Sequence, residues 1–219
     1  GQGSAIYAYS NYDTPIVLNA KLKGTTLGFT EKDKNTDLKQ ACLQAAREVI
    51  ASSGVESLSM REVARQLGVS HQAPYRHFES RDHLLAEVIK ICFIDFANFL
   101  DQRGPAQDSN HDLLNMGLQY IEYAEKKPLE YRLMFSTPWP EPANYPDLVE
   151  VATHAFNILR QAMRQRHGKT AEQQAKADLD ALYIWSTLHG MSSLKNSNFI
   201  PHLDLQKKVL QRFKELINN

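Results

Sequence analysis

The stretch that decides the fold is residues 59–78, which read S-M-R-E-V-A-R-Q-L-G-V-S-H-Q-A-P-Y-R-H-F. Its first part is typical of a short helix, because a serine stands three residues before a glutamate, an arrangement in which each side chain can bond the other's backbone N–H. Gly68 permits the left-handed backbone that ends such a helix. Ser70 is suited to cap a second short helix that reaches His77 or Phe78. The stretch therefore predicts a helix–turn–helix.

Pro74 bears on where that second helix begins. If Ser70 is the cap, the proline removes the first intrahelical hydrogen bond. If His71 is the cap, nothing is lost, because the N–H groups of a first helical turn have no intrahelical partner. The sequence leaves both alternatives open.

The flanking sequence is helical by its apolar period. Before the stretch, Leu38, Cys42, Ala45 and Val49 recur at a spacing that places them on one face, and Gly54 ends the pattern. After it, a helix starts at residues 80–82, with an apolar stripe of Leu84, Leu85, Val88, Ile91 and Cys92.

Further helices are predicted near 111–125, 128–135, 146–167, 171–195 and 204–217, with a loop over 102–110 and a proline-rich connection over 137–145. The prediction is an all-α chain of about nine helices. A non-helical N-terminal arm, either a short strand pair or an extended segment, occupies 1–35. A three-helix helix–turn–helix domain follows over 36–96, and a larger helical regulatory and dimerisation domain over 97–219.

Composition excludes several protein classes. The 219 residues are 42% hydrophobic and 23% charged, enough to bury a core, so a disordered chain is excluded. No apolar run exceeds five residues, which predicts a protein that does not span a bilayer and is soluble and cytoplasmic. Two cysteines provide neither a disulfide framework nor zinc-ligand spacing.

The charges decide how nucleic acid could be bound. The whole chain has 25 Lys and Arg against 25 Asp and Glu, which argues against a broadly basic surface. Residues 70–78, however, hold one arginine and two histidines and no acid. The arm carries four lysines, Lys21, Lys23, Lys32 and Lys34. We expect them to add contacts with the DNA backbone. The alternative is that they are charged side chains that contact only solvent.

The pattern resembles the N-terminal domain of TetR-family transcriptional regulators over roughly residues 37–92. The matching elements are Gly54, Leu58-Ser59, Val63-Ala64, Gly68-Val69-Ser70, Tyr75, Phe78 and the run from Ser80 to Leu85. Each stands at the family's spacing. Pro74 departs from the family pattern, which usually has an apolar, helix-compatible residue there.

This resemblance implies a DNA-binding surface. Its residues would be Ser59, Arg61, Ser70, His71, Gln72, Ala73, Tyr75, Arg76, His77 and Arg81. Ser59, Tyr75 and Arg81 would contact phosphates. His71, Gln72 and Ala73 would face base edges, since glutamine pairs with adenine and a methyl group with thymine. For His77 two alternatives remain, contact with DNA and packing in the core. His83 is expected on the surface.

Two segments of the C-terminal half, 127–135 and 184–194, resemble a TetR subgroup named for a Trp…His-Gly motif. The resemblance implies a dimerising domain that holds a small effector. Trp185 and His189 share one helical face, and either pack in a core or line an effector pocket with Tyr120, Tyr123, Met134 and Phe135. The dimer interface is predicted to include Leu182, Val209, Phe213 and Leu216.

An enzyme is not expected. The chain lacks Gly-x-Ser-x-Gly, a glycine-rich phosphate loop and His-Glu-x-x-His, and its eight histidines include no i, i+4 pair. No cofactor or metal is predicted, only an effector of unknown identity. The favoured function is a homodimeric, ligand-responsive repressor on a palindromic double-stranded operator. The rival is a helical scaffold that has lost specific DNA binding.

Overall fold

The computed structural model describes residues 31–197, with side chains from residue 37 onward, and residues 208, 211, 212 and 215. Seven α-helices make up this part of the chain, with three 3-10 helices and no strand. They are α1 (Glu31–Ser53), α2 (Met60–Leu67), α3 (Arg81–Asp101), α4 (Ser109–Lys126), α5 (Pro128–Phe135), α6 (Pro146–Arg166) and α7 (Ala171–Asn196). The 3-10 helices are η1 (Val55–Ser57), η2 (Pro74–Arg76) and η3 (Pro142–Asn144).

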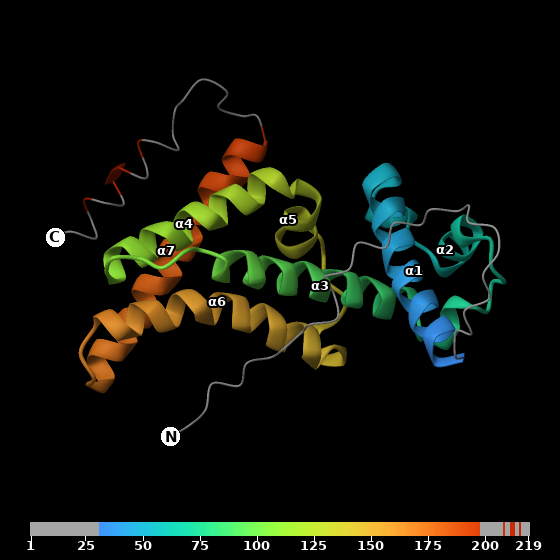
Figure 1. The fold of residues 1–219 in the computed structure, drawn as a ribbon, viewed down its shortest axis with the longest axis horizontal. Coiled ribbons are helices and arrows are strands. Elements are labelled where there is room, and N and C mark those ends of the chain that lie inside the picture. Colours follow the sequence, from blue (N-terminus) through green and yellow to red (C-terminus); the bar gives the residue numbers. More distant parts are fainter. Residues whose placement is uncertain (1–30, 198–207, 209–210, 213–214, 216–219) are drawn as a thin grey trace.

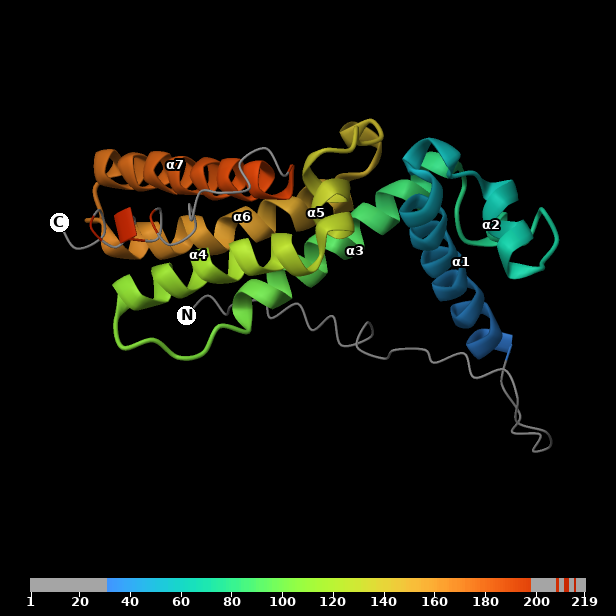
Figure 2. The ribbon, with the colours of Figure 1, turned by 90° about the horizontal axis from the view of Figure 1, so that it is seen from above.

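The helices form two groups that share α3 (Figure 1). The small unit consists of α1, η1, α2, η2 and the first turns of α3. The large unit consists of the rest of α3 with α4 to α7. α3 runs from one unit into the other (Figure 2), so the predicted division between residues 96 and 97 falls inside a continuous helix. That division stays a prediction.

α1 supports the small unit with the face that its sequence period predicts. Cys42, Ala45 and Val49 are all buried on it. The helix ends at Gly54, whose φ of 84° lies in the left-handed region that glycine adopts without strain. It begins at Glu31, earlier than predicted, so residues 31–35 belong to α1 and not to the arm. This run contains no proline or glycine to stop a helix.

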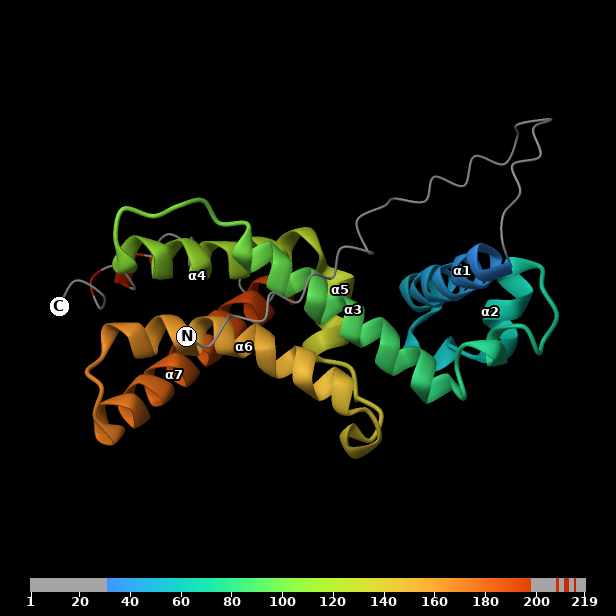
Figure 3. The same cartoon turned by 60° about the horizontal axis from the view of Figure 1, so that its bottom comes forward.

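The large unit follows the sequence prediction closely. α6 packs along α3, and α4 and α7 complete the bundle around them (Figure 3). α5 spans the predicted 128–135 and starts at Pro128, whose missing N–H is free of cost in a first turn. The cap of α4 is Asp108, whose carboxylate accepts from the N–H groups of Asn110 and His111 at 2.9 Å each.

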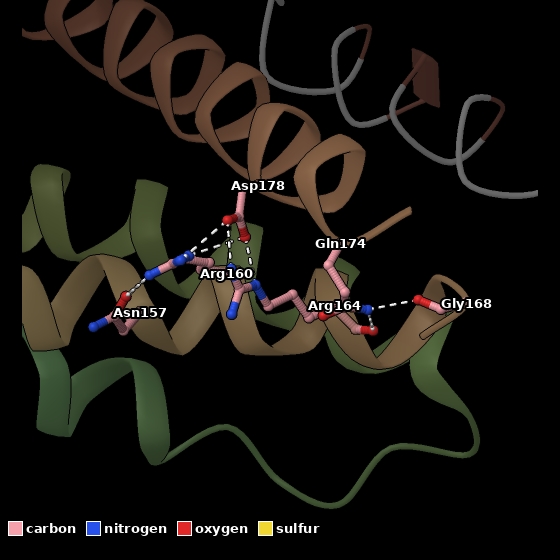
Figure 4. Close-up of polar contacts among 6 residues, drawn as sticks. All are labelled: Asn157, Arg160, Arg164, Gly168, Gln174 and Asp178. Carbon is pink, nitrogen blue, oxygen red and sulfur yellow. Dashed lines mark hydrogen bonds and ion pairs between the residues drawn. The ribbon is translucent and has the colours of Figure 1, made fainter. Parts of the chain in front are cut away.

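A charged clamp joins α6 to α7 (Figure 4). Arg160 and Arg164 on α6 each donate two hydrogen bonds to the carboxylate of Asp178 on α7, over 2.6 to 3.0 Å. Gln174 donates its side-chain amide to the carbonyls of Arg164 and Gly168, at 3.2 and 2.7 Å. These bonds satisfy acceptors at the end of α6 and fix which face of α7 turns inward.

The predicted count of nine helices is wrong for the described residues. The segment after Ser70 forms turns and the short η2 in place of an α-helix, because Pro74 cannot donate an N–H and the neighbouring bonds span three residues. The predicted last helix over 204–217 lies mostly outside the described residues. So do Val209, Phe213 and Leu216 of the predicted interface, and the arm over 1–30 with Lys21 and Lys23. Lys32 and Lys34 lie in α1, and their contacts with DNA stay a prediction.

Candidate nucleic-acid interface

α2 is held at both ends by the residues that the sequence singles out. The hydroxyl of Ser59 accepts the N–H of Glu62 at 3.1 Å. Gly68 ends the helix with a φ of 66°, and the N–H of Val69 donates to the carbonyl of Ala64 at 3.0 Å. Gly68 thus takes the left-handed position that the turn requires.

The second half of the predicted capping box does not form. The Glu62 carboxylate accepts from Arg65, one turn further along, with the Arg65 Nε at 2.9 Å. This hydrogen bond lowers the pKa of Glu62 from its ordinary value. Glu62 therefore stays charged, and the arginine compensates that charge beside the turn.

The turn and η2 separate polar from apolar side chains. Four side chains point to solvent, and they are His71, Gln72, Tyr75 and Arg76. Pro74 and Phe78 are buried on the opposite side. The N–H of Ala73 bonds the carbonyl of Ser70 at 3.0 Å, and those of His77 and Phe78 bond that of Pro74. These bonds rigidify the segment without an α-helix.

The structure differs from both alternatives for the helix cap and leaves little of Ala73 for the expected base contact. Neither Ser70 nor His71 caps a helix, because η2 begins after Ala73 with Pro74 as its first residue. Ala73 is only 8% exposed, so it presents little of its methyl group to a base edge. Ser70 is exposed at the end of the turn.

An open hollow of about 360 Å³ lies where α2 meets this segment, and Arg61, His71, Gln72 and Tyr75 line it. Arg61 extends from the first turn of α2, and the others come from the turn and η2. The lining provides guanidinium, imidazole, amide and phenol groups and no carboxylate. These are groups that pair with base edges and phosphates.

Arg81 has a contact that sequence analysis missed. Its Nη2 donates to the carbonyl of Val55 at 2.8 Å, and its Nε to that of Leu58 at 3.1 Å. Its Nη1 lies 3.1 Å from the Asp82 carboxylate. The guanidinium thereby ties the start of α3 to the first residue of η1 and to Leu58, directly before the Ser59 cap. The local sequence carries no signal for these bonds.

Two histidines sit against the same core. His77 is half-buried and edge-on to Phe78, and its Nε2 has no hydrogen-bond partner among the described residues. Burial first, then the charges of Lys39 and Arg76, lowers the pKa of His77, which favours the neutral ring. His83, which was expected on the surface, is half-buried, and it stacks on Tyr145 with 6.2 Å between ring centroids.

Comparison with known proteins identifies this arrangement. The family model for bacterial regulatory proteins of the tetR family matches residues 43–88, which contain α2, the turn and η2. The model for the Tetracyclin repressor-like C-terminal domain matches residues 113–218. The chain belongs to the TetR family.

Curated relatives of this TetR-family chain match it over one part. The HTH-type transcriptional regulator Rv1816 of Mycobacterium tuberculosis is 25% identical over 112 residues, which are 50% of this chain and 48% of the relative. The HTH-type transcriptional regulator SAUSA300_2515 of Staphylococcus aureus is 28% identical over 83 residues, 38% of this chain and 45% of the relative. The chain aligns with about half the length of these relatives.

Solved structures match the whole fold. The candidate regulatory protein SCO4313 superposes with a TM-score of 0.69 at 25% identity, covering 86% of this chain and 98% of that one. The fatty acid degradation regulator FadR from Bacillus halodurans superposes with a TM-score of 0.61 at 16% identity, covering 82% and 93%. The second likeness shows the fold alone.

The large unit of the TetR-family chain contains an aromatic cluster of Phe96, Tyr120, Tyr131, Phe135, Trp185 and His189. Tyr120 meets Trp185 edge-on at 5.2 Å between centroids, and Phe135 meets His189 at 5.1 Å. The Tyr131 hydroxyl bonds the Tyr120 hydroxyl at 3.1 Å and Nδ1 of His189 at 2.8 Å.

Most residues of the predicted pocket therefore meet in one place. Tyr123 and Met134 are buried as well, and Tyr123 adjoins the cluster through Phe96 and also packs on Phe99. The Tyr123 hydroxyl bonds Asp95, 3.0 Å away. Sequence analysis missed Tyr131, which joins Tyr120 to His189. The subgroup resemblance stays a prediction.

None of the helices in the described part of the chain is long and apolar enough to cross a membrane. Within the same residues, no three His, Cys, Asp or Glu side chains gather where they could hold a metal ion.

Proposed function

We propose that this chain is a DNA-binding transcriptional regulator that acts as a homodimer on a palindromic operator, and that a small ligand releases it. The observation that carries the proposal is the two-sided segment from His71 to Arg76. Its polar side chains that can pair with bases are exposed, while Pro74 and Ala73 fix it to the core. A scaffold that does not bind DNA has no need of this arrangement.

The residues that line the hollow contact the base edges. Gln72 can pair with adenine through its side-chain amide, and Arg61 with guanine through its guanidinium. Ser59 and Tyr75 contact phosphates on either side, and Arg76 adds a charge. Arg81 acts on this surface mainly by holding η1 and the start of α2 in place. Few phosphate contacts form per protomer, so dimerisation is needed for affinity.

The dimer uses the outward face of α7. Leu179, Leu182 and Tyr183, at positions i, i+3 and i+4, lie together on that face and are 67, 53 and 67% exposed. An apolar stripe of this kind on a long helix is typical of a helix–helix interface. Two copies joined there place two reading segments at successive major grooves, about 34 Å apart.

The aromatic cluster is where a small ligand binds and changes the affinity for DNA. A ligand that enters it separates rings that now touch, and this moves α5 and α7 relative to α3. Release from DNA then requires that the ligand bind the free conformation more tightly than the DNA-bound one.

Fluorescence anisotropy with DNA flanking the protein's own gene tests the proposal. The regulator is expected to bind that DNA at least 10³-fold more tightly than random DNA of the same length at physiological salt, which is the lower end for specific binding. Equal affinity for the two DNAs at every salt concentration would favour the scaffold. A sequence selected from a random pool serves if the operator lies elsewhere.

A further inference from the structure

α5 contacts the small unit and the aromatic cluster through neighbouring residues. Glu130 forms an ion pair with Arg47 of α1, and the two side chains are only 14 and 28% exposed. Tyr131, the next residue, is buried and bonds His189 of α7 and Tyr120 of α4. One turn of a short helix thus joins the helix that carries the small unit to the rings of the large unit.

α5 is itself firmly attached to the large unit. The Lys127 ammonium, just before α5, lies 2.6 Å from the carboxylate of Asp95 on α3. The Tyr123 hydroxyl lies 3.0 Å from the same carboxylate. The carbonyl of Lys127 accepts the N–H of Tyr131 at 2.9 Å. A change in the cluster at Tyr131 therefore moves Glu130 with it, because both stand on the same turn.

The Arg47–Glu130 pair adds a second attachment between the two units. The shared helix α3 is the first, with His83 on its first turn stacked on Tyr145, and a unit held along one helix can pivot about the axis of that helix. A tie from α1 to α5 lies off this axis and restricts the pivot. In a dimer, the pivot angle sets the distance between the two reading segments.

We propose that the Arg47–Glu130 ion pair positions the small unit according to the packing around Tyr131, so that α5 couples the aromatic cluster to DNA binding. The inference rests on the proposed function and names the residues that regulate it. Arg47 and Glu130 are positioning residues that contact no DNA. Their effect on affinity depends on the Tyr131 hydroxyl.

A double-mutant cycle tests this coupling without knowledge of the effector. The single variants are Glu130→Gln, which removes the charge at nearly constant shape, and Tyr131→Phe, which removes the hydroxyl. The probe is an operator sequence selected from a random DNA pool by the wild-type protein. Each single variant is expected to weaken binding about fivefold or more, the lower range of allosteric couplings. The double variant is expected to bind as weakly as Glu130→Gln alone.

The matched control is Glu122→Gln, which breaks an ion pair within α4, between Glu122 and Lys126 on its surface. It is expected to leave affinity unchanged. Arg47→Lys keeps the positive charge and is expected to retain most of the affinity that Arg47→Gln loses. His189→Gln replaces Tyr131→Phe in the cycle if the latter does not fold.

A second readout separates the possible failures. Hydrogen exchange of α1 and α2 amides, without DNA, is expected to rise in each single variant and no further in the double. If both the DNA and the exchange effects add independently, the coupling is wrong although DNA binding stands. If no DNA sequence is enriched, the proposed function fails, and the exchange cycle alone decides whether α5 couples the units.

Discussion

Arg81 provides the sharpest test of how the reading segment is supported. Its guanidinium donates to the carbonyls of Val55 and Leu58 from two different nitrogens. Lysine retains the charge but presents a single ammonium on a flexible chain, so it cannot reach both carbonyls in the same geometry. The change Arg81→Lys therefore separates the support of η1 from any contact with phosphate, which needs only the charge.

The expected loss of stability follows from these two bonds. A hydrogen bond to a charged donor contributes about 1.5–3 kcal/mol net, and lysine keeps one of the two. The Arg81 side chain is 38% exposed, so water replaces part of what is lost. We expect the free energy of unfolding to fall by about 1–2 kcal/mol after this discount for solvent screening.

Urea unfolding followed by circular dichroism measures this loss, and anisotropy in a salt series measures DNA binding. The matched control is Arg76→Lys, since Arg76 is exposed on η2. Arg81→Lys is expected to lower stability and to weaken DNA binding with an unchanged salt slope, while Arg76→Lys leaves stability unchanged. If the two variants unfold within about 0.3 kcal/mol of each other, the support role of Arg81 is refuted.

Three further predictions concern single positions. Gly68→Ala places a Cβ at a φ of 66° with no neighbouring atom within 4 Å, so calorimetry should show a purely conformational loss of roughly 1 kcal/mol, and no loss would contradict the left-handed turn. Leu182→Glu adds a charge to the exposed α7 face, and sedimentation should show a folded monomer where the proposed function requires the wild type to be a dimer. Hydrogen bonds from Arg164 and then Arg160 hold the pKa of Asp178 well below its usual 3.8, so its stabilisation is present above that pH and disappears as pH falls through the lower native pKa. Asp178→Asn should therefore unfold at lower urea than wild type at pH 7, with a difference that shrinks under acid, and a difference that persists at the lowest pH would contradict the clamp.

The helices could be predicted because their signals are local. The buried face of α1 follows from the spacing of its apolar residues, and the ends of α2 follow from Ser59 and Gly68. Pro74 shows the limit of such rules. The sequence raised the question of the cap, but the answer depends on how the turn packs against the core, and both local alternatives were wrong.

The site could be predicted only where one residue acts alone. Exposed Gln72 and buried Phe78 follow from the family pattern. Arg81 bonds Leu58 and Val55, which lie 23 and 26 positions away in the sequence, and Arg47 bonds Glu130, which lies 83 positions away. No local pattern marks such partners. The bond between Tyr131 and His189 likewise needs α5 and α7 in place.

The central claim is that residues from His71 to Arg76 read DNA sequence, and one pair of variants tests it most directly. Gln72→Ala removes an exposed amide from the hollow, and Gln66→Ala removes an exposed amide from α2 outside it. The measurement is the ratio of affinities for the selected operator and for random DNA. We predict that Gln72→Ala lowers this ratio by about 5- to 150-fold, the equivalent of roughly 1–3 kcal/mol for a base contact, while Gln66→Ala keeps it. An unchanged ratio in Gln72→Ala, or an equal fall in both variants, would contradict the account.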